Sequence, residues 1–227
     1  MKAGSVVRLA ARPVRGAPPV PVGSLRLLAG LGIDGDVHAD TLSPRQLLLA
    51  SAAAYEDFAL PPQALRENLL LGLETACLSS GTVLQIGGAV RLRMMFQCEA
   101  CGQLDAVQPR LAQRISTLHS TRRGMLARVL AGGIIRQGDP VQDLGVQTPA
   151  WSDDWRERVR RVLAAVPEGM VVEYRQLARL AGIQSSYCRA FPRLILQLGP
   201  ACAGKAVPSQ SPATSPRWAG AGLFDGY

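Results

Sequence analysis

The chain has 227 residues, of which 48% are hydrophobic and 19% charged, and its formal net charge is +8 at pH 7. This length leaves room for one or two domains, each with a hydrophobic core, and it contains neither an apolar run of membrane-spanning length nor a signal-peptide core. We therefore expect a cytoplasmic protein with no membrane partner. Five cysteines without regular spacing exclude a disulfide framework and indicate reduced thiols. The basic residues are nearly all arginines, which suit phosphates and carboxylates and are compatible with nucleic acid.

Short strands separated by glycine- and proline-rich turns dominate the first half of the chain. Strands are expected over three segments, residues 6–10, 24–28 and 45–49. Ser51 is placed to cap a helix that runs to about residue 58. Pro61-Pro62 is expected to open a second helix, which would carry Glu67-Asn68. Many short strands with glycine turns predict a mixed, barrel-like β domain with a few helices over residues 1–144.

A β-hairpin is predicted over residues 83–94, where apolar and basic side chains alternate after a Gly-Gly turn. Cys98 and Cys101 follow the end of this half-buried strand, where a thiol can be held rigidly and still meet solvent. Such thiols carry sulfur, bind a soft metal or act as nucleophiles, and the alternative is that they are small buried hydrophobes. A closed zinc site is not expected, because the remaining cysteines and the two histidines, His38 and His119, form no second close pair.

Residues 30–40 form a loop that is dense in glycine and carboxylates. The register and the closing glutamate of a calcium-binding loop are missing, so we do not expect calcium there. His38 lies in this loop, and it is either a structural hydrogen-bonding residue or part of a site.

Seven short motifs occur in the order that is typical of a MOSC domain: Gly35-Asp36-Val37-His38, Arg45-Gln46, Glu67-Asn68-Leu69, Gly81, Cys101-Gly102-Gln103-Leu104, Arg123-Gly124 and Gly138-Asp139-Pro140-Val141. Residues 5–144 thus resemble the module found at the C-terminus of molybdenum cofactor sulfurases. The resemblance implies a β-barrel-rich fold that handles sulfur or molybdenum cofactor through one cysteine. By position this cysteine is Cys101, which would be both the catalytic thiol and the metal ligand, and Ala100 stands where the family usually has proline.

The same resemblance implies a set of cofactor-binding residues: His38, Arg45, Glu67, Asn68 and Arg123. Arg45 and Arg123 would grip a pterin phosphate, and the alternative for each is an ordinary surface or ion-paired arginine. Cys98 is an extra thiol that would form a reversible disulfide or a persulfide relay with Cys101, so both count as candidate catalytic residues. Arg66 stands where the family often has glycine.

The second half predicts a mainly helical domain over residues 154–227, after a linker at residues 145–153. Helices are expected over three segments: from Asp154 as the cap to about residue 165, from about 175 to 180, and from Ser185 onward. With a short strand before the second helix and Gly182 after it, this is the outline of a winged helix-turn-helix. Pro192 falls inside the last helix, where it would cost about 3 kcal/mol or force a kink. The composition beyond Gly204 predicts loose order.

Three motifs in this half resemble the DNA-binding domain of O6-alkylguanine-DNA alkyltransferases and alkyltransferase-like proteins: Val166-Pro167-Glu168-Gly169, Tyr174-Arg175-Gln176-Leu177-Ala178 and Cys188-Arg189-Ala190. The resemblance covers residues 155–210 and implies double-stranded DNA as a partner of Tyr174, Arg175, Ser186 and Arg189. Arg189 would fill the gap left by a flipped base and Tyr174 would turn the adjoining phosphate; the alternative is a buried structural tyrosine and a solvated arginine. Residues 207–211 lack the cysteine, histidine and arginine of the active enzymes, so we do not expect alkyl transfer.

Two functions therefore remain open from the sequence. The first is a catalyst or carrier that works through Cys101 with molybdenum cofactor, as an oxidoreductase or sulfurtransferase, and whose partner is molybdopterin or a sulfur donor protein. The second is a non-enzymatic DNA-binding protein that senses alkylated bases for repair.

Overall fold

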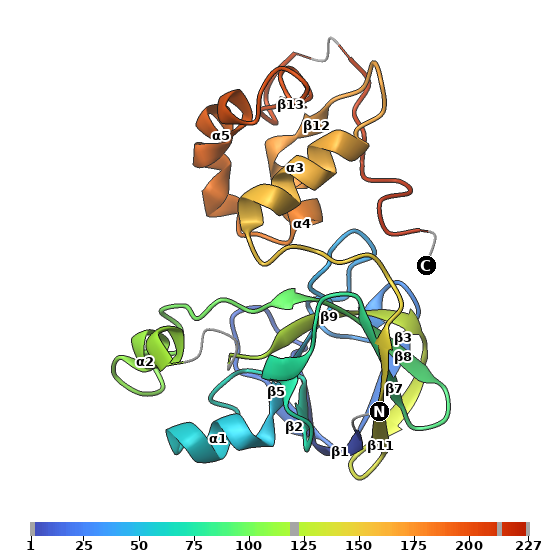
Figure 1. The fold of residues 1–227 in the computed structure, drawn as a ribbon, viewed down its shortest axis with the longest axis vertical. Coiled ribbons are helices and arrows are strands. Elements are labelled where there is room, and N and C mark those ends of the chain that lie inside the picture. The colour runs from blue at the N-terminus through green and yellow to red at the C-terminus, as the bar shows by residue number, and fades with distance from the viewer. Residues whose placement is uncertain (1–2, 119–122, 213–214, 226–227) are drawn as a thin grey trace. The chain divides into compact units, whose positions relative to one another are not determined.

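The chain divides into two compact units in a computed structural model that describes residues 3–118, 123–212 and 215–225 (Figure 1). The first unit comprises Met1–Thr41 and Arg45–Trp151, and the second comprises Leu42–Pro44 and Ser152–Tyr227. His119 lies outside the described residues. Within the described residues, no helix has the length and apolarity that a membrane span requires.

The first unit is a β-barrel built from short strands. Its strands are β1 (Ala3–Ala11), β2 (Val20–Val22), β3 (Ser24–Leu28), β4 (Gly32–Ile33), β5 (Leu47–Ser51), β6 (Leu69–Leu71), β7 (Thr82–Ile86), β8 (Val90–Gln97), β9 (Met125–Ala131), β10 (Gly133–Arg136) and β11 (Pro140–Val146). The order β11-β7-β8-β9-β5-β6-β1 closes on itself because β1 also pairs with β11, and β2 adds to β1 outside this ring. β5 and β6 pair in parallel, and the other neighbours in the ring are antiparallel. The predicted barrel with a few helices is confirmed.

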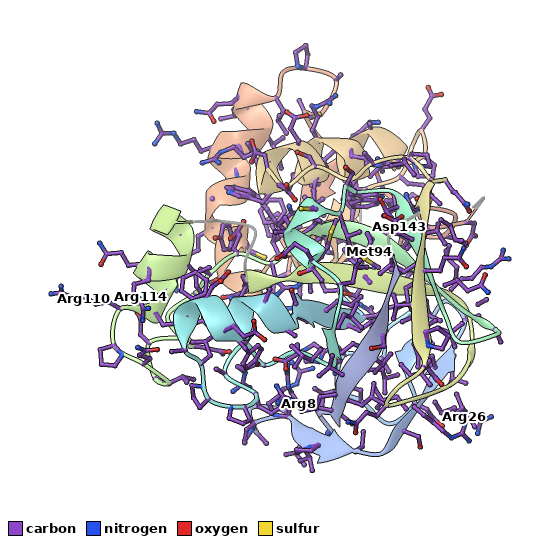
Figure 2. The ribbon with its side chains drawn as sticks, turned by 60° about the horizontal axis from the view of Figure 1, so that its bottom comes forward. Arg8, Arg26, Met94, Arg110, Arg114 and Asp143 are labelled. Carbon is purple, nitrogen blue, oxygen red and sulfur yellow. The ribbon has the colours of Figure 1, made fainter. Side chains whose placement is uncertain are left out.

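Alternating side chains fill the barrel interior. Met94 on β8 is fully buried there, whereas Arg26 on β3 points outward (Figure 2). A second core lies outside the barrel, where α1 (Ala52–Phe58) and α2 (Leu111–Leu118) cover residues of β5 and β6 (Figure 1). β5 and β6 are therefore buried on both faces, which explains why their sequences are continuously apolar rather than alternating. Ser51 caps α1 as expected, since its hydroxyl accepts from the amide of Ala53.

The helix expected after Pro61-Pro62 is absent from this described segment, and that prediction was wrong. Residues 62–65 form turns instead, and Gln63 and Arg66 adopt left-handed backbone angles, with φ of +64° and +58°. A left-handed residue cannot continue a right-handed helix. Glu67 and Asn68 consequently lie in the turn that leads into β6.

The expected linker is largely part of the first unit. β11 extends to Val146, and two side-chain hydrogen bonds attach the following segment to the barrel. Thr148 Oγ1 donates to the carbonyl of Gly81 at 3.1 Å, and Arg93 donates to the carbonyl of Pro149 at 2.6 Å. Trp151 is buried, and its amide donates to Ser80 Oγ at 2.7 Å. The prediction missed this because the segment's composition is that of a loop, while its order comes from tertiary contacts.

The second unit contains the helices that the sequence predicts. Its elements are α3 (Trp155–Ala165), β12 (Val172–Glu173), α4 (Tyr174–Ala181), a 3-10 helix η3 (Ser185–Ala190), α5 (Phe191–Gln197) and β13 (Ala206–Val207). Asp154 caps α3 by accepting from the amide of Arg156 at 2.9 Å, and Gly182 ends α4 with a φ of +65°. The antiparallel hairpin of a wing is not present among the described residues, because β12 and β13 pair in parallel.

Two expectations for this unit need correction. Pro192 does not kink a helix, because the chain changes from η3 to α5 at Phe191 and places the proline in the first turn of α5, where its missing N–H costs nothing. The described part of the tail is ordered rather than loose: Trp218 is buried and its amide donates to the carbonyl of Val171 at 2.8 Å. Gln176 also donates to the carbonyl of Ala219 at 2.6 Å.

Candidate functional site

A loop between β4 and β5 carries Asp36 and His38, and it is fixed by a buried glutamine. The amide of Gln46 donates to the carbonyl of Asp40 at 2.9 Å, and its oxygen accepts from the backbone of Val129 at 2.9 Å. Gln46 has no exposed surface, so its role is to attach the loop to β9. These hydrogen bonds therefore fix the conformation of the glycine-rich loop against β9.

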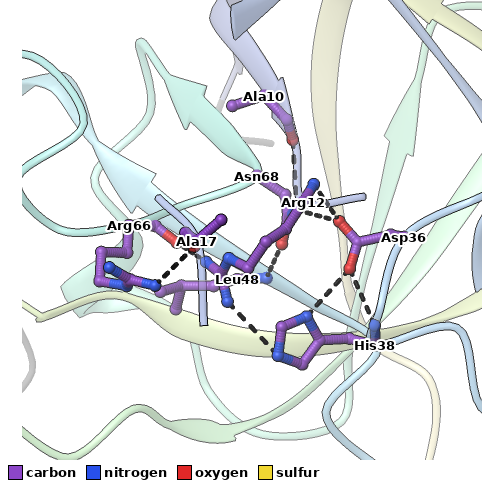
Figure 3. Close-up of polar contacts among 8 residues, drawn as sticks. All are labelled: Ala10, Arg12, Ala17, Asp36, His38, Leu48, Arg66 and Asn68. Carbon is purple, nitrogen blue, oxygen red and sulfur yellow. Dashed lines mark hydrogen bonds and ion pairs between the residues drawn. The ribbon is translucent and has the colours of Figure 1, made fainter. Parts of the chain in front are cut away.

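Asp36 is a buried carboxylate that accepts four hydrogen bonds (Figure 3). The amide of Arg12 donates at 2.7 Å, the amide and Nδ1 of His38 each donate at 2.9 Å, and Nδ2 of Asn68 donates at 3.2 Å. Burial by itself would raise the pKa of Asp36, but the hydrogen bonds from His38 and Arg12 outweigh it and hold the pKa below its ordinary value. Asp36 is thus an ionised anchor that joins β1, the loop and the start of β6.

His38 connects Asp36 to Arg12. Its Nδ1 lies 2.9 Å from the Asp36 carboxylate, which only accepts, and its Nε2 lies 3.3 Å from NH1 of Arg12, which only donates (Figure 3). Both contacts are satisfied together by one state, the neutral imidazole with its proton on Nδ1. His38 therefore serves as the acceptor that orients one side of the Arg12 guanidinium.

Two consecutive backbone carbonyls hold two arginines, one directly after β1 and one shortly before β9. The carbonyl of Arg66 accepts from NH2 of Arg12 at 2.7 Å, and the carbonyl of Leu65 accepts from NH1 of Arg123. Arg66 presents its carbonyl from the left-handed backbone angle where the MOSC pattern often has glycine, and its own guanidinium donates to the carbonyl of Ala17 at 3.0 Å (Figure 3). The buried Nε atoms of Arg12 and Arg123 have no hydrogen-bond partner. Buried donors without partners are rare, so these two nitrogens are candidate donors to an acceptor atom of a ligand or of a water molecule.

The charges of these arginines act on one another, and we call Arg12, Arg66 and Arg123 the arginine cluster. The pKa of Arg12 lies below its ordinary value, because of its burial and then because of the positive charge of Arg66, with a further contribution from Arg123. The negative charge of Asp36 acts in the opposite direction. The cluster therefore concentrates positive charge near a thiol, which favours binding of an anion.

Glu67 fixes the turn that carries the two carbonyls. It is buried, accepts from Arg8 at 3.1 Å and accepts from the hydroxyl of Tyr55 at 2.6 Å. The same hydroxyl accepts from the amide of Leu65 at 3.2 Å. Burial, and then the negative charge of Glu67, raise the pKa of Tyr55 far above its ordinary value, so the hydroxyl remains a donor. Glu67 thus acts through Tyr55 and the turn, and no described contact joins it directly to the arginine cluster.

The two cysteines lie beyond the end of β8, as predicted. Cys98 is buried, and its amide donates to the carbonyl of Gly124 at 2.8 Å, next to Arg123. Cys101 is half-buried and begins a turn in which its carbonyl accepts from the amide of Leu104 at 2.9 Å. Leu104 is buried in the second core. Both thiols are free. The structure thus places one thiol in the interior beside β9 and the other nearer the surface.

Of the predicted MOSC-type site residues, the structure brings His38, Asn68, Arg123 and Cys98 into one region. Arg45 is half-buried before β5, and none of the contacts above joins it to the arginine cluster. The sequence reading missed Arg12 and Asp36 as site residues and named Arg66 only as a departure from a pattern. No group of three or more histidine, cysteine, aspartate or glutamate residues that would hold a metal ion occurs among the residues described.

The predicted DNA-binding residues lie on two adjacent elements of the second unit. Tyr174 begins α4, with its ring 5.6 Å from that of Phe191, and Arg175 follows it on the exposed side. Ser186 and Arg189 are exposed on η3. Cys188 Sγ donates to the carbonyl of Tyr174 at 3.4 Å, which joins η3 to the start of α4.

Comparison with known proteins identifies the first unit. The family model of the MOSC domain matches residues 37–142, a span that includes His38, Asn68, both cysteines and Arg123. This span of the chain matches the MOSC domain. No curated protein matches the sequence significantly.

Solved structures share this MOSC fold at low sequence identity. YuaD from Bacillus subtilis is 20% identical with a TM-score of 0.55, and the alignment covers 62% of this chain and 94% of YuaD. YiiM from Escherichia coli is 17% identical with a TM-score of 0.52, covering 87% of this chain and 94% of YiiM. YiiM from Geobacillus stearothermophilus is 18% identical with a TM-score of 0.51, and the alignment covers 84% of this chain and 98% of that YiiM. Because the first unit makes up about two thirds of the chain, the YiiM alignments extend into the second unit, whereas the YuaD alignment is no longer than the first unit.

Proposed function

We propose that the MOSC domain handles sulfur or molybdenum cofactor through the thiols of Cys98 and Cys101, as a sulfurtransferase or oxidoreductase. The observation that carries this proposal is the position of a buried thiol next to Arg123, in a region where two buried guanidinium nitrogens have no partner. A thiolate accepts sulfane sulfur and binds soft metals, and guanidinium groups bind phosphate and other oxyanions. Cys101 is the thiol that a ligand from solvent reaches first, because it is the less buried of the two.

The residues present suit the phosphate of molybdenum cofactor, but they offer few ligands for its metal. The unpartnered Nε atoms of Arg12 and Arg123 suit the cofactor's phosphate. The metal would have to rely on the pterin's own sulfur atoms and a single thiolate, because the described residues offer no cluster of metal ligands. When bound, the cofactor would supply two-electron redox chemistry. The chain itself would hold the phosphate, orient it through the fixed guanidinium groups, and provide the thiolate.

The experiment is mass and elemental analysis of the full chain, purified freshly from cells that make the cofactor. We expect molybdenum, pterin or an added mass of one sulfur atom in the wild type, and its loss in Cys101→Ala. Cys98→Ala tests whether the interior thiol takes part in the same chemistry. Cys77→Ala is the matched control, because Cys77 is exposed in the 3-10 helix η1 (Thr75–Cys77) and should retain the modification. An unmodified wild type without metal, obtained from such cells, would contradict the proposal.

A second candidate function, DNA binding by the second unit, is supported by the contact between Cys188 and Tyr174. It puts the exposed Arg189 on an element adjacent to the exposed Arg175, whose charge acts on Cys188. Two arginines next to exposed serines suit a phosphate backbone.

Fluorescence anisotropy with duplex DNA at several salt concentrations tests this second function. Binding should weaken with salt and in Arg189→Ala, but Arg160→Ala on α3 should bind as the wild type does. Equal binding by the two variants would refute it.

A further inference from the structure

We infer that His38 is a proton-operated positioning residue for the oxyanion site: the neutral imidazole holds Arg12 in place for an anion, and its protonation releases Arg12 and weakens anion binding. This inference rests on the proposed oxyanion role of the arginine cluster. It adds a regulatory element to that site, with its own readout, and it assigns His38 an indirect role rather than contact with the ligand.

The first step is the fixed orientation of the imidazole. Nδ1 faces Oδ1 of Asp36 at 2.9 Å, and the backbone amide of His38 donates to the same oxygen at 2.9 Å. Asp36 is buried and carries its charge over the pH range in which histidine titrates, because its pKa is lowered further from an already acidic value. A 180° rotation of the ring would put Cδ2 in the position of Nδ1 and lose a charge-assisted hydrogen bond.

The second step is the contact on the opposite side of the ring. Nε2 lies 3.3 Å from NH1 of Arg12, and a guanidinium group has no acceptor atom. If Nε2 gains a proton, an N–H group faces an N–H group and two positive charges face each other. The contact then changes from attraction to repulsion, and Arg12 keeps only its bond to the carbonyl of Arg66 among its side-chain contacts described above.

The surrounding charges favour this response. The positive charges of Arg66 and Arg123 already disfavour the charged form of Arg12, and the negative charge of Asp36 favours it. A protonated His38 adds a further positive charge at one of the two acceptors that the Arg12 side chain now contacts, the other being the carbonyl of Arg66. The imidazole is also accessible to protons, since its side chain is 40% exposed. The imidazole is thus open to solvent, whereas Nε of the Arg12 guanidinium that it orients is buried.

The direction of the effect separates this inference from simple electrostatics. Added positive charge alone would make an anion bind more tightly as the pH falls. Release of Arg12 predicts the opposite, because a guanidinium that is no longer aligned loses the hydrogen bond that it offers the anion. Loss of one charge-assisted hydrogen bond corresponds to weaker binding by about tenfold.

The test uses sulfate as the probe, because it remains a dianion from pH 5.5 to pH 8.5. Calorimetric titration of the full chain at constant ionic strength should show about tenfold weaker binding at the acidic end than at the alkaline end. His38→Gln should bind with the wild-type affinity of pH 8.5 across the whole range, because a glutamine amide donates to Asp36 and its carbonyl accepts from Arg12 without titrating. Arg12→Gln locates the site and should bind sulfate weakly at every pH.

Each outcome bears on a different statement. Tighter wild-type binding at low pH, or a His38→Gln variant with the wild-type pH dependence, overturns the inference and leaves the anion site standing. Sulfate binding that Arg12→Gln does not weaken overturns the oxyanion role of the arginine cluster, on which this inference rests. The imidazole state is checked independently by two-bond ¹H–¹⁵N spectra of the wild type at pH 8.5, which need no variant. A proton on Nδ1 supports the inference, and a proton on Nε2 overturns it.

Discussion

Replacement of Asp36 by asparagine provides a direct test of the network that organises the site. The carboxylate has no exposed side-chain surface, and each of its oxygens accepts two hydrogen bonds: Oδ2 from Arg12 and Asn68, and Oδ1 twice from His38. Asparagine keeps one acceptor oxygen and replaces the other by an NH₂ group, which only donates. Whichever way the amide turns, two buried donors then face a donor.

The expected cost follows from that arrangement. A buried donor that loses its acceptor costs about 1–3 kcal/mol, so two of them predict a loss of about 2–6 kcal/mol in the free energy of unfolding. Asp34→Asn is the matched control, because Asp34 is two residues away, half exposed and 3.9 Å from Arg26. We expect that control to change the free energy of unfolding by at most about 0.5 kcal/mol.

The assay is urea unfolding at pH 7, followed by circular dichroism, with the midpoints of the wild type and both variants compared. The same comparison at pH 3 tests how the contribution of Asp36 to stability depends on pH. Because the pKa of Asp36 is lowered on folding, its contribution to stability is present above the ordinary pKa of an aspartate and is lost as the pH falls through the folded value. The gap between wild type and Asp36→Asn should therefore narrow in acid. A variant as stable as Asp34→Asn at pH 7 would refute the four-donor description.

Three further substitutions test the packing of both units by the same unfolding assay. Arg158→Ala should lower the free energy of unfolding by about 2–4 kcal/mol, because this buried side chain donates to three backbone carbonyls, whereas the exposed Arg160→Ala should change it by less than about 0.5 kcal/mol. Gly124→Ala should cost about 3 kcal/mol or more, since a Cβ would meet a backbone oxygen of β5 at 2.2 Å; Gly88→Ala, with open space around it, should be nearly neutral. Ala59→Gly should stabilise the protein by about 1 kcal/mol, because Ala59 ends α1 at a φ of +50°.

Local patterns were sufficient to predict much of the scaffold. The hairpin of β7 and β8 follows from alternation and a glycine turn, and the caps at Ser51, Asp154 and Gly182 follow from residue types at helix ends. In each case the controlling contacts lie within a few residues of one another. The thiols were likewise located correctly after the strand, because the end of β8 is set by the same local alternation.

The arginine cluster could not be found in this way, because its contacts are distant in sequence. Arg12 and the carbonyl of Arg66 are separated by 54 positions, and Arg123 and the carbonyl of Leu65 by 58. They meet only because β1 pairs with β6 and the barrel closes. The failed helix after Pro61 has the same origin: the proline pair is a valid helix start, but the turn is bent by left-handed residues that are stabilised through these distant side chains.

Arg123 and Gly124 illustrate how one motif joins scaffold and site. Gly124 has a φ of +110° and passes so close to β5 that no side chain fits. β9 begins at the next residue, and the carbonyl of Gly124 itself accepts from the amide of Cys98. The side chain of the preceding Arg123 donates to the carbonyl of Leu65. The glycine is therefore a condition for the arginine's position rather than a separate feature. It follows that Gly124→Ala, unlike a purely structural change elsewhere in the barrel, should displace both the guanidinium and the thiol, whereas Gly88→Ala should leave both where they are.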